Sequence, residues 1–160
     1  MNALGRKVDW QQVTPVGWHA HHGGVDKLLS SFNTVPNGQR VRLAKTTSNL
    51  FRSRAGESAG LDVSGLRGVI AIDPVDKTAD VQGMCTYEDL VDATLPFGLA
   101  PLVIPQLKTI TLGGAVSGMG VESTSFRNGL PHESVLEMDV LVGTGEIVTC
   151  SREENVELFR

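Results

Sequence analysis

The stretch from Leu102 to Gly129 constrains the fold most, because it combines glycines and hydroxyl side chains with very few charges. Glycine lets a backbone approach another surface closely or adopt a positive φ angle. The small residues from Gly113 to Gly118 predict a short helical turn whose free N–H groups would suit phosphate oxygens. Glycine-rich loops also close turns in β-rich domains, so composition alone leaves both interpretations open.

The spacing within this stretch excludes two common nucleotide-binding motifs. It is not G-x-G-x-x-G, and it lacks the G-K-[ST] ending of a phosphate-binding loop. Pro105 is followed by T-L-G-G-A-V-S-G from Thr111, then by G-V-E-S-T-S from Gly120 and by Asn128-Gly129. This wording resembles the PCMH-type FAD-binding domain of the vanillyl-alcohol oxidase / p-cresol methylhydroxylase flavoproteins. Within that superfamily it is most similar to the delta-24 sterol reductases and their bacterial relatives, over roughly residues 41 to 160.

The resemblance implies an α+β fold of the PCMH type. It would have a small N-terminal βα subdomain up to about Leu66, followed by a larger mixed sheet flanked by helices. Residues 1–24 would form an irregular N-terminal extension, and residues 25–160 would form the FAD-binding domain. A helix expected to begin at Ser151 has only part of its apolar face. The domain therefore looks incomplete, and we expect the chain by itself to bind FAD poorly and to show no turnover.

The resemblance also implies which residues contact the cofactor. At the diphosphate it places a polar loop of Lys45, Thr46, Thr47, Ser48 and Asn49. At the diphosphate, ribityl chain and ring it places Gln106, Thr111, Gly113, Gly114, Ser117, Gly118, Gly120, Glu122 and Ser123. Glu122 could instead pair with Arg127, and the polar loop, which lacks the family's glycines and arginines, could simply be exposed. Because that loop holds no His or Cys, FAD is expected to be bound non-covalently, with His132 or Cys85 as the alternative attachment sites.

The implied reaction is hydride transfer by an FAD-dependent oxidoreductase on a small-molecule substrate, as in the sterol reductases. A sugar or alcohol oxidase of the same superfamily and a non-catalytic fragment are the alternatives. A flavin performs redox chemistry that no side chain can perform. No catalytic residue can be named, because the resemblance places the substrate domain outside this sequence.

Composition narrows the remaining function classes. A net charge of -4 without a basic stripe argues against nucleic-acid binding. No apolar run is long enough to cross a bilayer, and no signal peptide opens the chain. Cys85 and Cys150 have no metal-ligand spacing, so free thiols and a cytoplasmic location are expected. His19, His21 and His22 fit a loop better than a metal site.

Hydrophobic periodicity and turn residues predict the secondary structure. Helices are expected over 25–32, from a Thr86/Asp89 capping box to Gly98, and from Ser151. Strands are expected over 41–44, over 69–73 paired with 78–82, and over 135–142 paired with 147–149. The Gly/Ser-rich segment 55–66 is expected to be a connection.

Overall fold

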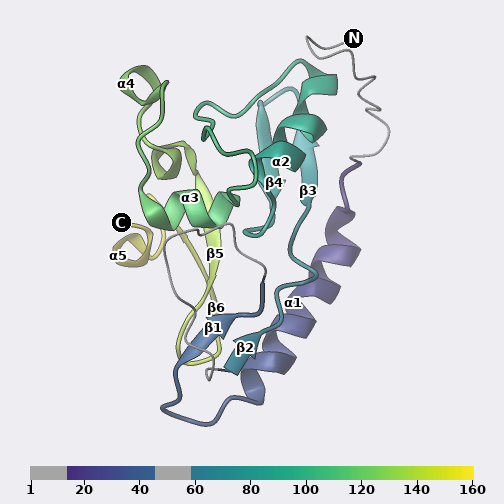
Figure 1. Ribbon diagram of the computed structural model, residues 1–160, viewed down its shortest axis with the longest axis vertical. Coiled ribbons are helices and arrows are strands. Elements are labelled where there is room, and N and C mark those ends of the chain that lie inside the picture. Colours follow the sequence, from purple (N-terminus) through teal and green to yellow (C-terminus); the bar gives the residue numbers. More distant parts are fainter. Residues whose placement is uncertain (1–13, 46–58) are drawn as a thin grey trace.

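The computed structural model describes residues 14–45 and 59–160 of the chain. A long first helix is followed by short strands and short helices (Figure 1). The elements are α1 (Gly17–Asn33), β1 (Val41–Leu43), β2 (Ala59–Leu61), β3 (Val69–Asp73), β4 (Thr78–Val81), α2 (Tyr87–Thr94), η1 (Leu95–Phe97), α3 (Leu112–Gly118), α4 (Ser125–Asn128), η2 (Pro131–Ser134), β5 (Glu137–Leu141), β6 (Ile147–Ser151) and α5 (Val156–Phe159).

The described strands pair as three separate two-stranded sheets. β1 and β2 are parallel, with Val41 opposite Ala59, whereas β3–β4 and β5–β6 are antiparallel hairpins. The α+β class is therefore confirmed. The larger mixed sheet is not seen among the described strands, because no backbone hydrogen bonds join one pair to another.

The first helix begins earlier than the sequence indicated. α1 starts at Gly17, so residues 17–24 are helical and the predicted irregular extension is wrong over that range. The three histidines consequently lie on a helix and not in a loop. α1 can come close to the turn before β3, because a Cβ on Gly65 would lie 2.7 Å from the Cα of Gly24. Residues 1–13 lie outside the described residues.

The main core forms where α2 lies across the β3–β4 hairpin (Figure 1). Its buried members are Val69, Cys85, Tyr87, Leu90, Ala93 and Ala115. The predicted hairpin is confirmed, and Asp73 stabilises its turn by accepting the N–H groups of Val75 and Asp76. Burying such apolar side chains contributes about 1.5–3 kcal/mol each for the larger ones.

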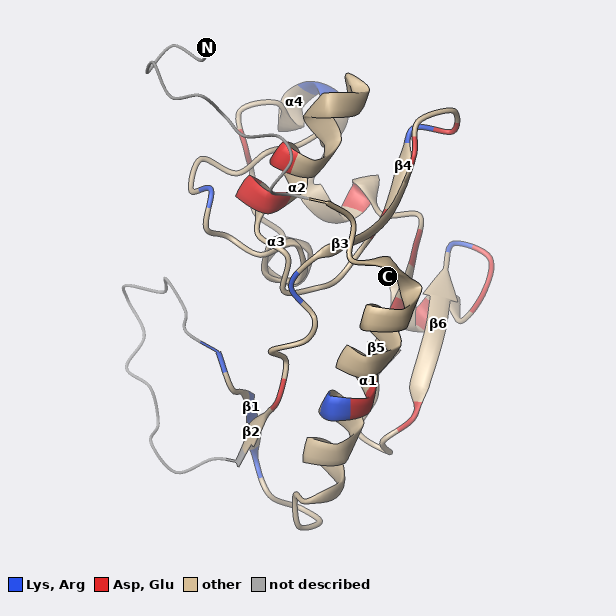
Figure 2. Ribbon diagram, turned by 90° about the vertical axis from the view of Figure 1, so that its right-hand side faces the viewer, with Lys and Arg blue, Asp and Glu red and all other residues tan. Residues whose placement is uncertain are grey.

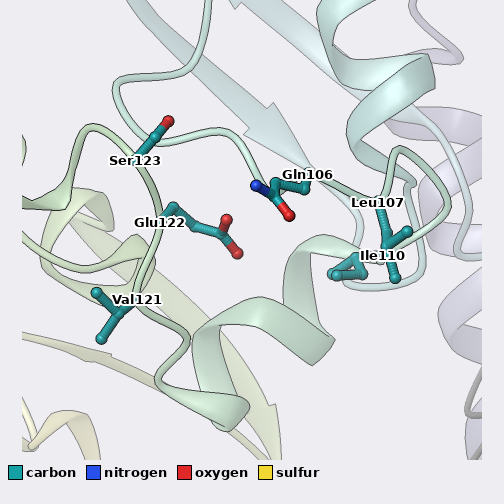
Figure 3. A pocket seen from close by; sticks show the side chains of 6 residues that line it. All are labelled: Gln106, Leu107, Ile110, Val121, Glu122 and Ser123. Carbon is teal, nitrogen blue, oxygen red and sulfur yellow. The ribbon is translucent and has the colours of Figure 1, made fainter.

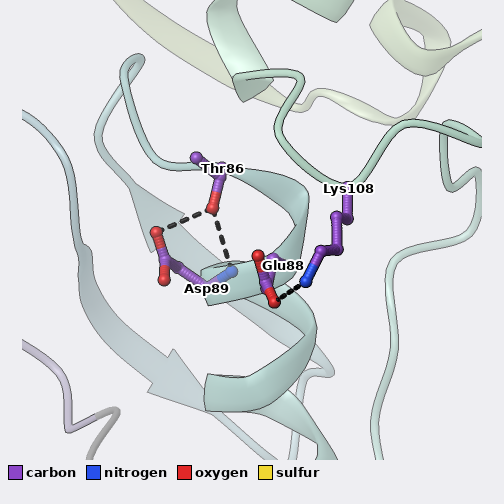
Figure 4. Close-up of polar contacts among 4 residues, drawn as sticks. All are labelled: Thr86, Glu88, Asp89 and Lys108. Atoms are coloured by element: carbon purple, nitrogen blue, oxygen red, sulfur yellow. Dashed lines mark hydrogen bonds and ion pairs between the residues drawn. The ribbon is translucent and has the colours of Figure 1, made fainter.

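The predicted N-cap of α2 is also confirmed (Figure 4). The Thr86 hydroxyl oxygen accepts the Asp89 N–H over 3.1 Å and donates to the Asp89 carboxylate over 2.7 Å. The first turn of α2 carries Glu88 and Asp89, the acidic turn visible in Figure 2. Negative charge there is favourable at the positive end of the helix dipole.

Two segments differ from their predictions. Part of the expected 55–66 connection is strand β2, which ends at the buried Leu61 and is followed by the buried Val63. Ser151 ends β6 by pairing with Glu137, so the last helix begins only at Val156. The Ser151 hydroxyl nevertheless caps the turn between them, since it accepts the N–H groups of residues 153 and 154.

Over the described ranges, the chain contains no helix with the length and hydropathy needed to span a membrane.

Candidate functional site

The site lies in a recess of about 390 Å³ between two segments of the glycine-rich stretch. Gln106, Leu107 and Ile110 line one side, and Val121, Glu122 and Ser123 line the other (Figure 3). The carboxylate of Glu122 extends toward the side chain of Gln106. Three residues predicted to bind the cofactor thus share one recess, although 16 positions separate Gln106 from Glu122.

The Gln106 side of the recess is held against the beginning of α2. The N–H groups of Tyr87 and Glu88 donate to the carbonyls of Ile110 and Lys108, each over 3.0 Å. The side chains of Lys108 and Glu88 also form an ion pair (Figure 4). Exposed ion pairs contribute little stability, so the backbone bonds set the loop position and the ion pair adds orientation.

The Glu122 side is fastened to the same loop at a point further upstream. The carbonyl of Leu102 accepts hydrogen bonds from Thr124 over 3.2 Å and from Asn128 over 2.7 Å. Ser125 and Glu122 exchange two further bonds, one through the Ser125 hydroxyl and one through its N–H. The Glu122 wall is therefore anchored to the segment that carries Gln106, and that segment is in turn anchored to α2.

The small-residue helix predicted between the two walls is confirmed as α3, but its first N–H groups are not free. Leu112 donates to Cys85 and Gly113 donates to Gly83, each over 2.8 Å. Gly114 donates to the hydroxyl of Thr111, which is the N-cap. These N–H groups are already hydrogen-bonded within the protein, so the prediction that they are free to bind phosphate oxygens is wrong.

The glycines serve several different purposes. Gly113 allows close backbone packing, since a Cβ there would lie 2.8 Å from the Gly83 oxygen. Gly118 faces open space, and none of the predicted cofactor glycines has a positive φ. That conformation belongs to Met119, whose φ of 47° ends α3. A Cβ on Gly120 would lie 3.6 Å from the Glu122 carboxylate, which is an ordinary contact distance, so the space around residue 120 does not require glycine.

The remaining predicted residues are distributed as follows. Ser117 donates its hydroxyl hydrogen to the Gly113 carbonyl within α3, over 2.7 Å. Lys45 follows β1 and is not among the residues lining the recess. Thr46, Thr47, Ser48 and Asn49 lie outside the described residues, so their predicted contacts remain predictions.

The alternative role for Glu122 finds no support. Among the described residues, the ion pairs are Lys108–Glu88 and Arg160–Glu157, and neither includes Glu122 or Arg127. Burial raises the pKa of Tyr87, and the negative charge of Glu122 raises it further. Glu122 is therefore electrostatically linked to a core residue beside the recess.

Sequence reasoning missed the apolar half of the lining, formed by Leu107, Ile110 and Val121. Their alternation with polar neighbours was a usable signal, because Ile110 precedes Thr111 and Val121 precedes Glu122. No group of three potential metal ligands gathers anywhere in ranges 14–45 and 59–160.

Comparison with known proteins gives the family. The model of the FAD binding domain family matches residues 34–151. The chain therefore belongs to the FAD binding domain family, whose cofactor is FAD.

Individual similar proteins support the same family. Over 141 residues the chain is 38% identical to cytokinin dehydrogenase 3 of Oryza sativa subsp. japonica, covering 84% of this chain and 27% of that protein. It is 42% identical over 80 residues to cytokinin dehydrogenase 7 of the same plant, covering 50% of this chain and 15% of that protein. The structure of 6-hydroxy-D-nicotine oxidase from Arthrobacter nicotinovorans matches with a TM-score of 0.67 and 26% identity, covering 82% of this chain and 29% of that one. These homologues are FAD-dependent oxidoreductases, and the chain spans less than a third of the length of each.

The recess suits the ribityl chain and ring of FAD better than it suits the diphosphate. Its lining offers a carboxylate, an amide and a hydroxyl beside three apolar side chains, and it contains no Lys or Arg. Such a set suits ribityl hydroxyls and ring N–H groups, because they donate to carboxylate and amide oxygens. It does not suit a diphosphate, whose charge would face Glu122.

Proposed function

We propose that this chain supplies part of the FAD site of an oxidoreductase, with the recess between Gln106 and Glu122 holding the ribityl chain or ring. The observation that carries the proposal is the meeting of Gln106, Glu122 and Ser123 in one recess, inside the segment that matches the family. Gln106 would donate to and accept from the ligand, and Glu122 would accept from its hydroxyl or N–H groups.

We assign the diphosphate to the loop that begins at Lys45, outside the recess. Lys45 is half-buried at the end of β1 and carries a positive charge that suits phosphate oxygens. The three hydroxyl side chains after it and Asn49 would add further hydrogen bonds. FAD would be bound non-covalently, since this loop offers neither His nor Cys.

When bound, FAD supplies the capacity to accept or deliver a hydride. We propose a reaction like that of the delta-24 sterol reductases on a small-molecule substrate, supported by the T-L-G-G and G-V-E-S-T-S wording from Thr111 and Gly120. A cytoplasmic location is proposed with it.

A second candidate is dehydrogenation of a cytokinin-type substrate, favoured by the 38% identity over 84% of this chain. Anaerobic bleaching of the flavin separates the two when the whole flavoprotein is mixed with substrate. A cytokinin would bleach it only under the second candidate. Under the first candidate only, a reduced nicotinamide would bleach the flavin, and a delta-24 unsaturated sterol would then reoxidise it.

Titration of FAD fluorescence tests the assignment of the recess in the chain itself. Gln106→Ala should weaken saturable binding, whereas Gln39→Ala, at an exposed position away from the recess, should not. Equal affinity of the two variants would remove Gln106 from the site. A complete lack of saturable binding by the unaltered chain would show that FAD binding needs more than residues 1–160.

A further inference from the structure

Gln82 joins α1 to the turn that precedes β3. Its side chain is 3% exposed, and its amide meets three partners. The amide oxygen accepts the Gly68 N–H over 2.7 Å. The amide nitrogen donates to the Gly65 carbonyl over 3.1 Å and lies 3.3 Å from Nδ1 of His21 on α1.

Two of these partners fix the orientation of the amide. The Gly68 N–H can only donate, so it requires the amide oxygen, and the Gly65 carbonyl can only accept, so it requires the amide nitrogen. A flipped Gln82 would lose both bonds and bury a donor against a donor, at a cost of about 1–3 kcal/mol per unsatisfied group. The second hydrogen of the amide therefore points to His21.

This geometry assigns the protonation state of His21. Nδ1 must carry a lone pair to accept from Gln82, so the imidazole is neutral and its hydrogen is on Nε2. A proton on Nδ1 would place an N–H against an N–H that cannot turn away. The contact can be satisfied in one protonation state of His21 only.

The charges around His21 act in both directions. Burial and the neighbouring His22 on α1 lower the pKa of His21, whereas Asp139 of β5 and Asp80 of β4 raise it. The net effect is a lowered pKa for His21. Trp18, on the same helix, packs its ring edge-on against the imidazole at 5.7 Å between centroids.

We propose that the N-terminal half of α1 is docked by a protonation-sensitive contact, in which a proton on Nδ1 of His21 removes the acceptor for Gln82 and loosens the helix from the Gly65–Gly68 turn. The C-terminal half has a separate anchor, because the Ser31 hydroxyl accepts the Asp62 N–H over 2.9 Å. The effect is thus confined to the part of α1 near His21.

The pH window follows from the direction of the shift. The docked state disfavours protonated His21, so its pKa is below the ordinary 6.5. Docking is complete above pH 6.5, weakens as the pH falls below that value, and stops weakening once the docked form itself is protonated.

Hydrogen exchange at the amides of α1 measures the loosening, after correction for the intrinsic pH dependence of exchange. Between about pH 7.5 and about pH 5, protection of residues 20–24, the first amides bonded within the helix, should fall about threefold or more, with residues 25–33 as the internal reference. His21→Gln keeps a side-chain acceptor for Gln82 but cannot titrate, so it should abolish the pH dependence. His19→Gln, at an exposed position on the same helix, should retain it.

Nitrogen NMR of the histidine rings tests the premise without any substitution. The expected result at neutral pH is a His21 ring protonated on Nε2 and unprotonated on Nδ1. Three results would overturn the proposal: an Nδ1–H tautomer, a His21 pKa at or above 6.5, or the same acid-induced loss of protection in the unaltered chain and His21→Gln.

Discussion

The N–H of Gly113 donates to the carbonyl oxygen of Gly83 over 2.8 Å, and a Cβ on Gly113 would lie 2.8 Å from that same oxygen. The hydrogen bond therefore exists only because residue 113 has no side chain. This contact seats α3 against the segment that leads into α2, and it places the two walls of the recess on either side of α3.

Gly113→Ala should destabilise the fold, because its methyl group would have to displace backbone atoms of Gly83. Overpacking of this kind costs about 1–3 kcal/mol. Gly118→Ala is the matched control in the same helix, since its Cβ would meet nothing within 4 Å. It should be neutral or stabilising by up to about 1 kcal/mol. Urea unfolding measures both, and equal midpoints would contradict the role given to Gly113.

Thr86→Ala should cost about 1 kcal/mol of unfolding free energy, because the first turn of α2 loses its N-cap. The same change should loosen the loop at Lys108, which is bonded to that same first turn at Glu88. Thr109→Ala removes a hydroxyl from an exposed turn and serves as the control. If the two variants unfold at the same urea concentration, the Thr86–Asp89 contact adds no stability.

The alkaline limit of stability should depend on Cys85. Burial raises the pKa of this thiol from 9.0 to about 12, and the charge of Asp89 adds to the rise. The unfolded chain then loses its thiol proton before the folded chain does, so stability falls as the pH rises from 9.0 toward 12. The slope contributed by one such group is at most about 1.4 kcal/mol per pH unit.

Cys85→Ala should lower overall stability but flatten this alkaline slope, measured by urea unfolding at several pH values above 9.0. The slope that remains would include Tyr87, whose pKa is raised in the same direction. An unchanged slope in Cys85→Ala would show that the thiol ionises equally in the folded and unfolded chains.

Local sequence signals predicted the elements whose ends are set by neighbouring residues. The Thr86 cap, the β3–β4 turn and α3 were all foreseen, since each depends on side chains within a few positions. The start of α1 was missed because the stretch before Val25 has glycines and histidines and no apolar stripe, yet Gly24 and His21 pack against the Gly65–Gly68 turn. Tertiary packing settled that boundary.

The candidate site was likewise predicted only in part. Gln106 and Glu122 were identified from the family wording, and the structure brings them together. The state of the α3 N–H groups could not be foreseen, because their acceptors at Gly83 and Cys85 lie far upstream in the sequence. Spacing within a motif predicts which residues lie close together. It does not predict which distant carbonyl groups will accept hydrogen bonds from their N–H groups.

We propose that the flavin is bound non-covalently, so acid precipitation of the flavin-loaded protein should leave the yellow colour in the supernatant. The two alternative attachment sites are buried to different degrees. Cys85 is 0% exposed and its thiol stays protonated, whereas a thiolate is the reactive form. Nδ1 of His132 is buried without a hydrogen-bond partner. Flavin that stayed in the pellet would contradict this prediction and direct peptide mapping to these two residues.

Glu122→Gln should weaken binding of riboflavin and FAD but leave binding of ADP unchanged. The substitution keeps the size of the side chain and removes the charge that accepts from ribityl or ring donors. A hydrogen bond to a charged group contributes about 1.5–3 kcal/mol, so the dissociation constant should rise about tenfold or more. Glu153→Gln, at an exposed position after β6, is the charge-matched control. Calorimetry with riboflavin, FAD and ADP on each variant provides the measurement. ADP binding that tightens in Glu122→Gln would instead place the diphosphate beside this carboxylate, and it would assign the recess to the other end of the cofactor.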